Sequence, residues 1–568
     1  MSDNLYRKLS EERKQLQEQG LVPQWYTTGG YQLFKEKYEY QTEGRSVKGQ
    51  FERIAKTAAK HLKGTKFESR AEEKFFELFW KGWLSPSTPV LANMGTTRGM
   101  PVSCSGTIVE DSIDGFYSNL HEIAMLTKNG FGTASDFSHI RPRGSKIANG
   151  GKANGVIPVI KEHVQCMRSV TQGTARRGAW AVYLKIDHGD FDELIDLIQA
   201  EPDDLNVGWT ITNEFLDGLN KGNPENIRRF QRAMKTKLIT GKGYFFFVDK
   251  ANEKRPQMYK DLGLTINNTQ LCCEIMLFND EDHTYSCVLS SMNVAKYNEW
   301  KETDAAFWAL IFLDCVASEF IEKAKDIPGL EKTVRFTEKS RALGLGLAGL
   351  HTLFMQEGLA FESFGAHMLS QEIQAKLWDD SLKASQELAI ELGEPEWCKG
   401  YGVRNSHRLA NAPTKSTALI MGGISEGINP SPAMCYTQLT AAGEVERIDA
   451  VLLQLMKDKG VYNKKNIQQI IDKQGSVQHV DWLNDEEKTI FKTAFEINQK
   501  SVIRMASARS KYLDQWQSLN LFFSAEEDPA WIAEVHQEAF NDPNILALYY
   551  IHSQAGVQAA KGECEACM

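Results

Sequence analysis

The distribution of apolar and polar residues differs between the first eighty residues and the rest of the chain. Residues 1–25 are charged and helix-prone, and residues 48–83 repeat apolar positions with a helical period. The two prolines in residues 85–93 favour an extended or turning chain. The pattern therefore predicts a helical N-terminal region that ends near residue 84.

Short apolar segments alternate with glycine-rich turns and helix-like stretches between residues 93 and 215. The predicted elements are strands at 102–109, 180–185 and 207–211, a helix at 113–128, and a glycine-rich loop at 144–155. This alternation of strands and helices predicts a parallel or mixed sheet with crossover helices.

The remaining chain continues the mixed pattern. Residues 215–262 read as helices around one strand at 243–248, and apolar runs at 271–277 and 285–292 predict a hairpin. Long helical runs are predicted at 300–325, 335–356 and 364–392. Residues 555–568 lack apolar periodicity, which is typical of a mobile tail. Since no segment resembles a linker, a single large core is expected.

Composition narrows the class of protein. The chain has 568 residues, of which 42% are hydrophobic and 24% charged, as in ordinary globular proteins. A net charge of −9 argues against a nucleic-acid-binding protein, which needs a basic face. The N-terminus lacks the apolar core of a signal peptide, and the apolar run 307–320 is too short to span a bilayer. A cytoplasmic protein with no membrane contact is expected.

The stretch Asn-Asn-Thr-Gln-Leu-Cys-Cys-Glu, residues 267–274, holds thiols and an acid in an apolar run. If it is extended, Gln270, Cys272 and Glu274 share one face, because side chains alternate along a strand. Thiol chemistry beside a general base is one interpretation. A buried strand in which cysteine acts as a small hydrophobic residue is the other.

Two further motifs have local interpretations. Residues 344–349 match the dinucleotide pattern G-x-G-x-x-G, but a polar, helix-like segment precedes them where a strand is required. Close helix packing across small residues is predicted instead. Cys564 and Cys567 have the spacing of a redox or metal pair. Two ligands are too few for a closed zinc site, so no metal is predicted in this chain.

Six separated segments together resemble one family, the large catalytic subunits of ribonucleotide reductase. They are residues 87–93, 103–104, 271–275, 287–293, 413–417 and 549–550. The resemblance implies a ten-stranded α/β barrel at 85–550 with a central finger loop, which we define as residues 267–274. A helical region at 1–84 without an ATP cone would precede the barrel, and a redox-active tail at 551–568 would follow it.

The resemblance also implies roles for the thiols and the acid. Cys272 resembles the thiyl radical that removes the 3′-hydrogen of the ribose, and Glu274 resembles the base at the 3′-hydroxyl. Cys104 and Cys287 resemble the dithiol that becomes a disulfide in each turnover. Gln270 stands where the family has an asparagine that contacts the 2′-hydroxyl, so the sequence departs from its family there.

Other segments resemble substrate and radical-transfer sites for a ribonucleoside diphosphate. The residues expected to bind substrate are Ser87, Thr88, Ser103, Thr414, Lys415, Ser416 and Thr417. Tyr549 and Tyr550 resemble the last relays of a radical path from a separate, metal-containing small subunit, which favours class I. The radical would arise in that partner, so no cofactor bound in this chain is expected.

The same resemblance implies a source of electrons for the enzyme and a regulatory site. Cys564 lies fourteen residues after Tyr550, a span of about 45–50 Å when extended. Cys564 and Cys567 are therefore expected to re-reduce the buried disulfide and to be renewed by thioredoxin or glutaredoxin. Asp111 and Arg141 fall where a deoxynucleotide effector would bind, and a homodimer is expected. The alternatives are an adenosylcobalamin-dependent class II reductase and a catalytically idle nucleotide-binding paralogue.

Overall fold

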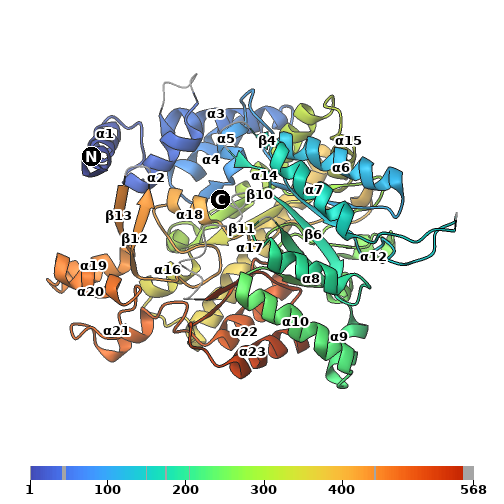
Figure 1. Ribbon diagram of the computed structural model, residues 1–568. Helices are drawn as coiled ribbons and strands as arrows, with labels where there is room; N and C mark the ends of the chain where they lie inside the picture. Colours follow the sequence, from blue (N-terminus) through green and yellow to red (C-terminus); the bar gives the residue numbers. More distant parts are fainter. Residues whose placement is uncertain are drawn as a thin grey trace.

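Helices occupy most of the first eighty residues. The computed structural model describes residues 2–40, 46–148, 150–172, 176–203, 205–440 and 443–553. The first helices are α1 Ser2–Glu18, α2 Thr28–Leu33, α3 Val47–Ala59 and α4 Glu68–Trp80. Helix α3 begins where the Ser46 side chain accepts a hydrogen bond from the Gly49 N–H. It packs on α4 through Phe51 and Phe79, whose ring centroids lie 5.8 Å apart. The predicted helical N-terminal region is thus present (Figure 1).

A seven-stranded sheet forms the larger half of the barrel. Its order is β15-β8-β7-β6-β3-β2-β9, and the five strands from β8 to β2 are parallel neighbours. The strands are β2 Cys104–Ile108, β3 Gly132–Asp136, β6 Trp180–Lys185, β7 Asn206–Ile211, β8 Tyr244–Phe247, β9 Tyr285–Ser286 and β15 Ala547–Leu548. Both edge strands are antiparallel to their neighbours. The predicted mixed sheet is confirmed.

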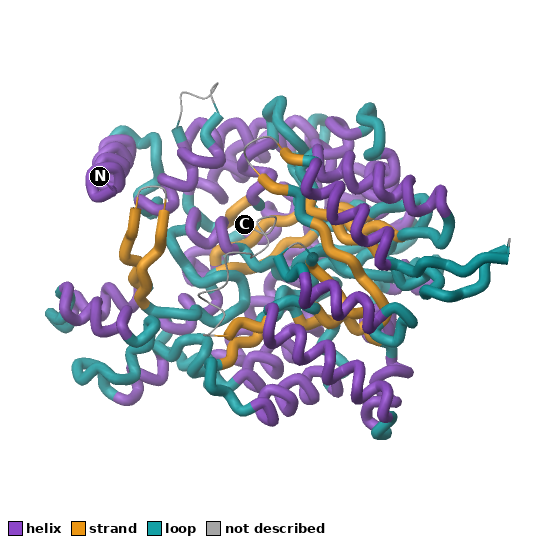
Figure 2. Tube along the Cα trace, in the orientation of Figure 1, coloured by secondary structure: helices purple, strands orange, loops and turns teal. Residues whose placement is uncertain are grey.

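Helices connect the parallel strands and lie around the strands in the interior (Figure 2). They are α6 Ile113–Lys128, α7 Ile157–Ser169, α8 Phe191–Ala200, α9 Asn213–Asn220 and α10 Pro224–Thr240. Every residue of β3 is buried, as expected for a parallel strand covered on both faces. The carboxyl ends of these parallel strands therefore lie at one rim of the barrel, and their amino ends lie at the other.

A three-stranded sheet supplies further barrel wall. It consists of β1 Leu84–Pro86, β10 Leu289–Asn293 and β11 Gly344–Ala348, with β10 antiparallel to β1 and parallel to β11. The predicted helix at 335–356 is wrong, because β11 separates α15 Glu331–Ser340 from α16 Leu350–Gln356. Helix packing at 344–349 is also wrong, because Gly344–Ala348 form the strand β11. A Cβ on Gly346 would lie 2.3 Å from the Ala410 carbonyl oxygen, so this glycine allows close approach of a neighbouring segment to the strand.

The predicted hairpin at 271–277 and 285–292 is also wrong. Residues 271–280 form no strand, whereas β9 joins the seven-stranded sheet and β10 joins the three-stranded one. Cys273 has a φ of 66°, a left-handed conformation that turns the chain and ends any strand alternation there. The finger loop is therefore a turn in the barrel interior. Residues 85–86 are extended, as part of β1, but residues 88–93 are not, since they form α5 Thr88–Asn93 with Pro89 in its first turn.

The remaining elements surround this barrel. The helices are α11 Val248–Lys254, α12 Gln257–Asp261, α13 Tyr297–Trp300, α14 Ala305–Ala324, α17 Phe364–Leu392, α18 Lys415–Ile420, α19 Ala450–Asp458, α20 Lys464–Asp472, α21 Asp485–Ile490, α22 Gln499–Arg509 and α23 Pro529–Asn541. The strands are β4 Thr171–Gln172, β5 Arg176–Arg177, β12 Cys435–Thr440, β13 Gly443–Ile448, β14 Leu521–Phe523 and β16 Ile551–Ser553. One buried hydrophobic cluster extends from Val22 to Ile551. Within the described part of the chain, no helix has the length and apolar character needed to cross a membrane.

Candidate active site

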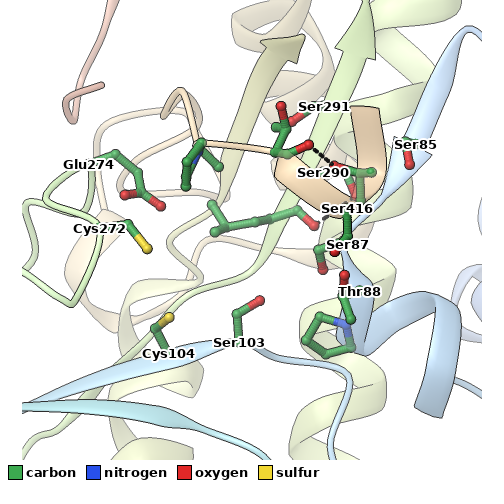
Figure 3. Close-up of a pocket in the computed structure, with 16 residues that line it drawn as sticks. Ser85, Ser87, Thr88, Ser103, Cys104, Cys272, Glu274, Ser290, Ser291 and Ser416 are labelled. Carbon is green, nitrogen blue, oxygen red and sulfur yellow. Dashed lines mark hydrogen bonds between the residues drawn. The ribbon is translucent and has the colours of Figure 1, made fainter. Parts of the chain in front are cut away.

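The finger loop presents Cys272 and Glu274 to one cavity. Both side chains line it, together with Cys104 from the start of β2 and hydroxyl-bearing residues from three other segments. Figure 3 shows the Cys272 and Cys104 sulfurs and the Glu274 carboxyl directed into the space that these residues enclose. That space amounts to about 560 Å³, part of it open to solvent. Of the three residues expected to share a face, Cys272 and Glu274 reach the cavity and Gln270 does not, and the loop that presents them is a turn and not a strand.

Hydroxyl groups line the rest of the cavity. The lining residues of this kind are Ser85, Ser87, Thr88, Ser103, Ser290, Ser291, Thr414, Ser416 and Thr417. The Ser87 Oγ atom is buried and has no hydrogen-bond partner among the residues that the structure describes. A buried donor of this kind carries a desolvation cost that a bound ligand can remove. The cavity is therefore suited to a polar, oxygen-rich ligand.

Cys104 and Cys287 lie opposite one another on adjacent strands. The Cys287 N–H donates to the Cys104 carbonyl over 2.9 Å, one position beyond the pair Ser105–Ser286 of β2 and β9. Both thiols are buried and free, and only Cys104 lines the cavity. Burial, followed by the nearby Cys104 thiol, raises the pKa of Cys287 well above its usual value. Cys287 is thus held as a neutral thiol, opposite Cys104 at the spacing of directly opposed residues on antiparallel strands.

The Glu274 carboxyl is fully buried and has few polar partners. Its Oε2 accepts a hydrogen bond from the Ser518 hydroxyl over 2.9 Å, and its backbone carbonyl accepts one from the Trp516 N–H. Burial raises the pKa of Glu274 to about 7, although the Ser518 hydrogen bond acts in the opposite direction. A carboxyl with this pKa can both accept and release a proton near neutral pH, as general acid–base catalysis requires.

The raised pKa of Glu274 predicts a pH-dependent cost to stability. A carboxyl whose folded pKa of about 7 exceeds its ordinary value of 4.5 stabilises the fold fully below pH 4.5, and this contribution is lost as the pH rises through 7. We expect Glu274→Gln to have nearly the parental melting temperature at pH 5. At pH 8.5 it should be more stable, by at most about 3 kcal/mol. Thermal unfolding at both pH values checks this, and equal melting temperatures at pH 8.5 would contradict it.

Gln270 does not line the cavity. Its Oε1 accepts the Ile275 N–H over 3.0 Å across the turn, and its Nε2 makes no hydrogen bond with the described residues. The Gln270 side chain therefore stabilises the turn of the finger loop by this internal hydrogen bond. The longer side chain, in place of the family asparagine, spans the turn that the left-handed Cys273 creates.

The segment 413–417 borders the opposite side of the cavity. Thr414 lies in the left-handed region with a φ of 58°, which is strained for a β-branched residue, and α18 starts directly after it. Its hydroxyl accepts the Gly427 N–H over 2.7 Å, which stabilises the strained conformation. Thr414, Ser416 and Thr417 line the cavity, whereas Lys415 is exposed and does not.

Tyr549 and Tyr550 lie in ring contact near the finger loop, with their planes inclined by 47°. Their ring centroids are 4.1 Å apart, and the Tyr549 N–H donates to the carbonyl of Leu519, the residue after Ser518. Sequence reasoning missed a third tyrosine, Tyr244 on β8, whose hydroxyl donates to that of Tyr550 over 3.1 Å. It also missed Ser518. No motif marks either residue, because each reaches the site only through tertiary folding.

A buried lysine contacts the backbone next to Tyr244 and at Tyr549. Lys237 on α10 donates to the carbonyls of Gly243 and Tyr549, which ties the start of β8 to the tyrosine pair. Burial lowers the pKa of Lys237 to about 7.

The expected effector residues lie away from the cavity. Arg141 donates to Asp111 over 2.6 Å, and both side chains are partly exposed. The structure thus brings the two together as a surface ion pair. Cys564 and Cys567 lie outside the described residues, and their predicted role stays a prediction.

Comparison with known proteins identifies the class of this chain. A family model described as "Ribonucleotide reductase, all-alpha domain" matches residues 24–99, and one described as "Ribonucleotide reductase, barrel domain" matches 102–227, 226–400 and 395–551. A helical domain followed by this barrel, with cysteines and an acid in its cavity, defines a ribonucleotide reductase fold.

Individual relatives agree with that class. The chain is 31% identical over 528 residues to the "Putative ribonucleoside-diphosphate reductase large subunit" of Frog virus 3, covering 87% of this chain and 92% of the relative. It is 27% identical to the zebrafish large subunit, covering 85% and 70%. The solved structure of the Actinobacillus ureae class Id ribonucleotide reductase alpha subunit matches with a TM-score of 0.86 and 34% identity, covering 95% and 99%. This chain belongs to the ribonucleotide reductase family, as a large, class I type subunit, and its predicted fold class is confirmed.

Proposed function

We propose that this chain reduces ribonucleoside diphosphates to deoxyribonucleoside diphosphates by a thiyl-radical mechanism. The observation that carries the proposal is the convergence of Cys272, Glu274 and Cys104 on one hydroxyl-lined cavity, with Cys287 paired to Cys104. The names of the large-subunit relatives support a diphosphate substrate. Family membership supports the reaction type, and the cavity supports the assignment of individual residues.

The residues divide the reaction among them. The Cys272 thiyl radical takes the hydrogen atom from C3′ while Glu274 accepts the proton of the 3′-hydroxyl. The 2′-hydroxyl then leaves as water. Cys104 and Cys287 supply two electrons and two protons and become a disulfide, and Cys272 returns its hydrogen atom to C3′. The raised pKa of Glu274 supports its role, because the same carboxyl must accept and return a proton near neutral pH.

Hydroxyl groups and backbone N–H groups are proposed to bind the diphosphate. Ser87, Thr88, Ser103, Thr414, Ser416 and Thr417 line the cavity and are the candidates. The buried, unpartnered Ser87 hydroxyl supports this assignment. Lys415 is exposed at the start of α18 and would contribute charge at the cavity entrance without lining it.

Partners complete the proposed cycle. A class I small subunit would deliver the radical to Tyr550, and Tyr549 would pass it to Cys272; the contact between the two rings supports a transfer step from one to the other. We further propose that Cys564 and Cys567 re-reduce the Cys104–Cys287 disulfide and are renewed by thioredoxin or glutaredoxin. A deoxynucleotide effector at Asp111 and Arg141, and a homodimer, complete the proposal.

An activity assay with and without a small subunit tests this function. The chain, co-purified with a candidate class I small subunit and a dithiol reductant, should convert ribonucleoside diphosphates to deoxynucleotides, and adenosylcobalamin alone should give none. Turnover with adenosylcobalamin alone would identify class II chemistry instead. Tight diphosphate binding without turnover in the complete system would indicate an idle paralogue. Repeating the assay on all four substrates with each deoxynucleoside triphosphate tests the effector; unchanged ratios would contradict it.

A further inference from the structure

The Ser518 hydroxyl faces two acceptors that belong to the finger loop. Its Oγ lies 2.9 Å from Glu274 Oε2 and 2.7 Å from the backbone carbonyl oxygen of Cys272. Ser518 is fully buried, so water does not compete for the hydroxyl. Because a serine hydroxyl carries a single proton, it cannot donate at full strength to both acceptors at once.

The backbone around Ser518 is held firmly. Its N–H donates to the Asn411 carbonyl over 2.9 Å, and its own carbonyl accepts from the Asn429 amide over 3.0 Å. Two residues earlier, the Trp516 N–H donates to the Glu274 carbonyl. The Ser518 Oγ is therefore fixed in position relative to the finger loop, and rotation of its O–H bond is the remaining freedom.

This geometry gives Glu274 Oε2 a hydrogen bond with Ser518 in either protonation state of the carboxyl. When the carboxyl is ionised, the Ser518 O–H donates to it. When the carboxyl is protonated, its own O–H can donate to Ser518 Oγ, and the serine proton turns to the Cys272 carbonyl. A side chain without a hydroxyl at position 518 can form neither hydrogen bond. The ionised carboxylate loses more stabilisation than the protonated carboxyl, because charge-assisted hydrogen bonds are the stronger ones, so the pKa of Glu274 should rise.

We propose that Ser518 is a positioning residue that serves both protonation states of Glu274 and couples them to the backbone of Cys272. The inference rests on the proposed function, in which Glu274 is the base at the sugar hydroxyl. Residues 515–518 thereby hold the Glu274 carboxyl and Cys272 in fixed relative positions while the proton moves.

Other titratable groups lie near Glu274, and they are the same in the parent and in the Ser518 variants. Burial raises the pKa values of Cys273, Tyr285 and Cys287 far above neutral, so these groups keep their protons near pH 7. The Cys104 and Cys272 side chains line the same cavity as Glu274. Lys237 interacts with Cys273, and it is unchanged in every variant compared below.

The test compares Ser518→Thr with Ser518→Val, which have the same shape and differ only in the hydroxyl. The full chain with its small subunit is assayed from pH 5.5 to 9 for kcat and KM. In the Val variant, we expect the acid limb of the profile of kcat against pH to move to higher pH by about one unit. This corresponds to a tenfold loss of kcat at pH 6, with KM unchanged. The Thr variant should keep the parental limb. Ser340→Ala, which removes a buried hydroxyl outside the cavity, should also keep it.

Two results would overturn the role of Ser518. The first is a Val profile that superimposes on that of Thr, and the second is a Val profile lowered equally at every pH, as general misfolding would give. Glu274→Gln, assayed in parallel, separates this inference from the proposed function. Retained turnover in Glu274→Gln contradicts the base assignment itself, whereas an inactive Glu274→Gln with an unshifted Val profile contradicts only the role of Ser518.

Discussion

Replacing Cys272 by serine should abolish turnover and leave substrate binding nearly intact. The serine O–H bond is stronger than the thiol S–H bond, so an oxygen radical does not form there under conditions that form a thiyl radical. The side chain keeps almost the same size in the buried finger loop. We expect kcat to fall by at least about a thousandfold, because the group that acts only in the transition state is lost.

The control for this variant is the neighbouring thiol. Cys273→Ser changes a buried cysteine that does not line the cavity and that contacts the Tyr183 hydroxyl over 3.6 Å. Its kcat should stay within a few-fold of the parent, whereas Cys272→Ser should be inactive. Steady-state assay with the small subunit and equilibrium binding of a nucleoside diphosphate measure the two effects. Turnover in Cys272→Ser would refute the radical assignment.

Local sequence patterns predicted the elements whose periodicity is uninterrupted. Residues 113–128 and 364–392 form helices at the predicted bounds, because each has one consistent buried face. Residues 180–185 form a strand, as their short apolar run predicts for a strand buried on both faces. The predicted helix at 335–356 failed where two helical patterns flank a glycine-rich strand. Only a glycine fits at position 346, because the Ala410 backbone, which belongs to another segment, lies too close for a Cβ atom.

The finger loop shows the same limit at the site. Its apolar run is compatible with a strand, yet it turns at Cys273 and is held by hydrogen bonds from residues 515–518, which lie some 240 positions away. Short-range periodicity carries no information about such partners. The resemblance named the residues that converge on the cavity, but it could not supply Ser518, Tyr244 or Lys237, which only tertiary packing brings to the site.

Tyr550→Phe should remove turnover as completely as Cys272→Ser does, although it alters no group in the substrate cavity. The Tyr550 hydroxyl accepts a hydrogen bond from Tyr244, and its ring lies 4.1 Å from that of Tyr549. Phenylalanine keeps the ring contact and loses the O–H, so the ring can pack but cannot exchange a proton and an electron. We expect kcat to fall by about a thousandfold or more with KM for substrate unchanged.

A matched tyrosine distinguishes radical transfer from packing. Tyr401 is exposed, donates to Asp261 and does not line the cavity, so Tyr401→Phe should retain full activity. Circular dichroism and affinity for the small subunit should be the same for both variants and the parent. Because Tyr550 lies outside the cavity lining, only a path from a partner subunit makes its hydroxyl essential. Near-parental turnover in Tyr550→Phe would therefore contradict the class I radical path, even if Cys272 proved indispensable.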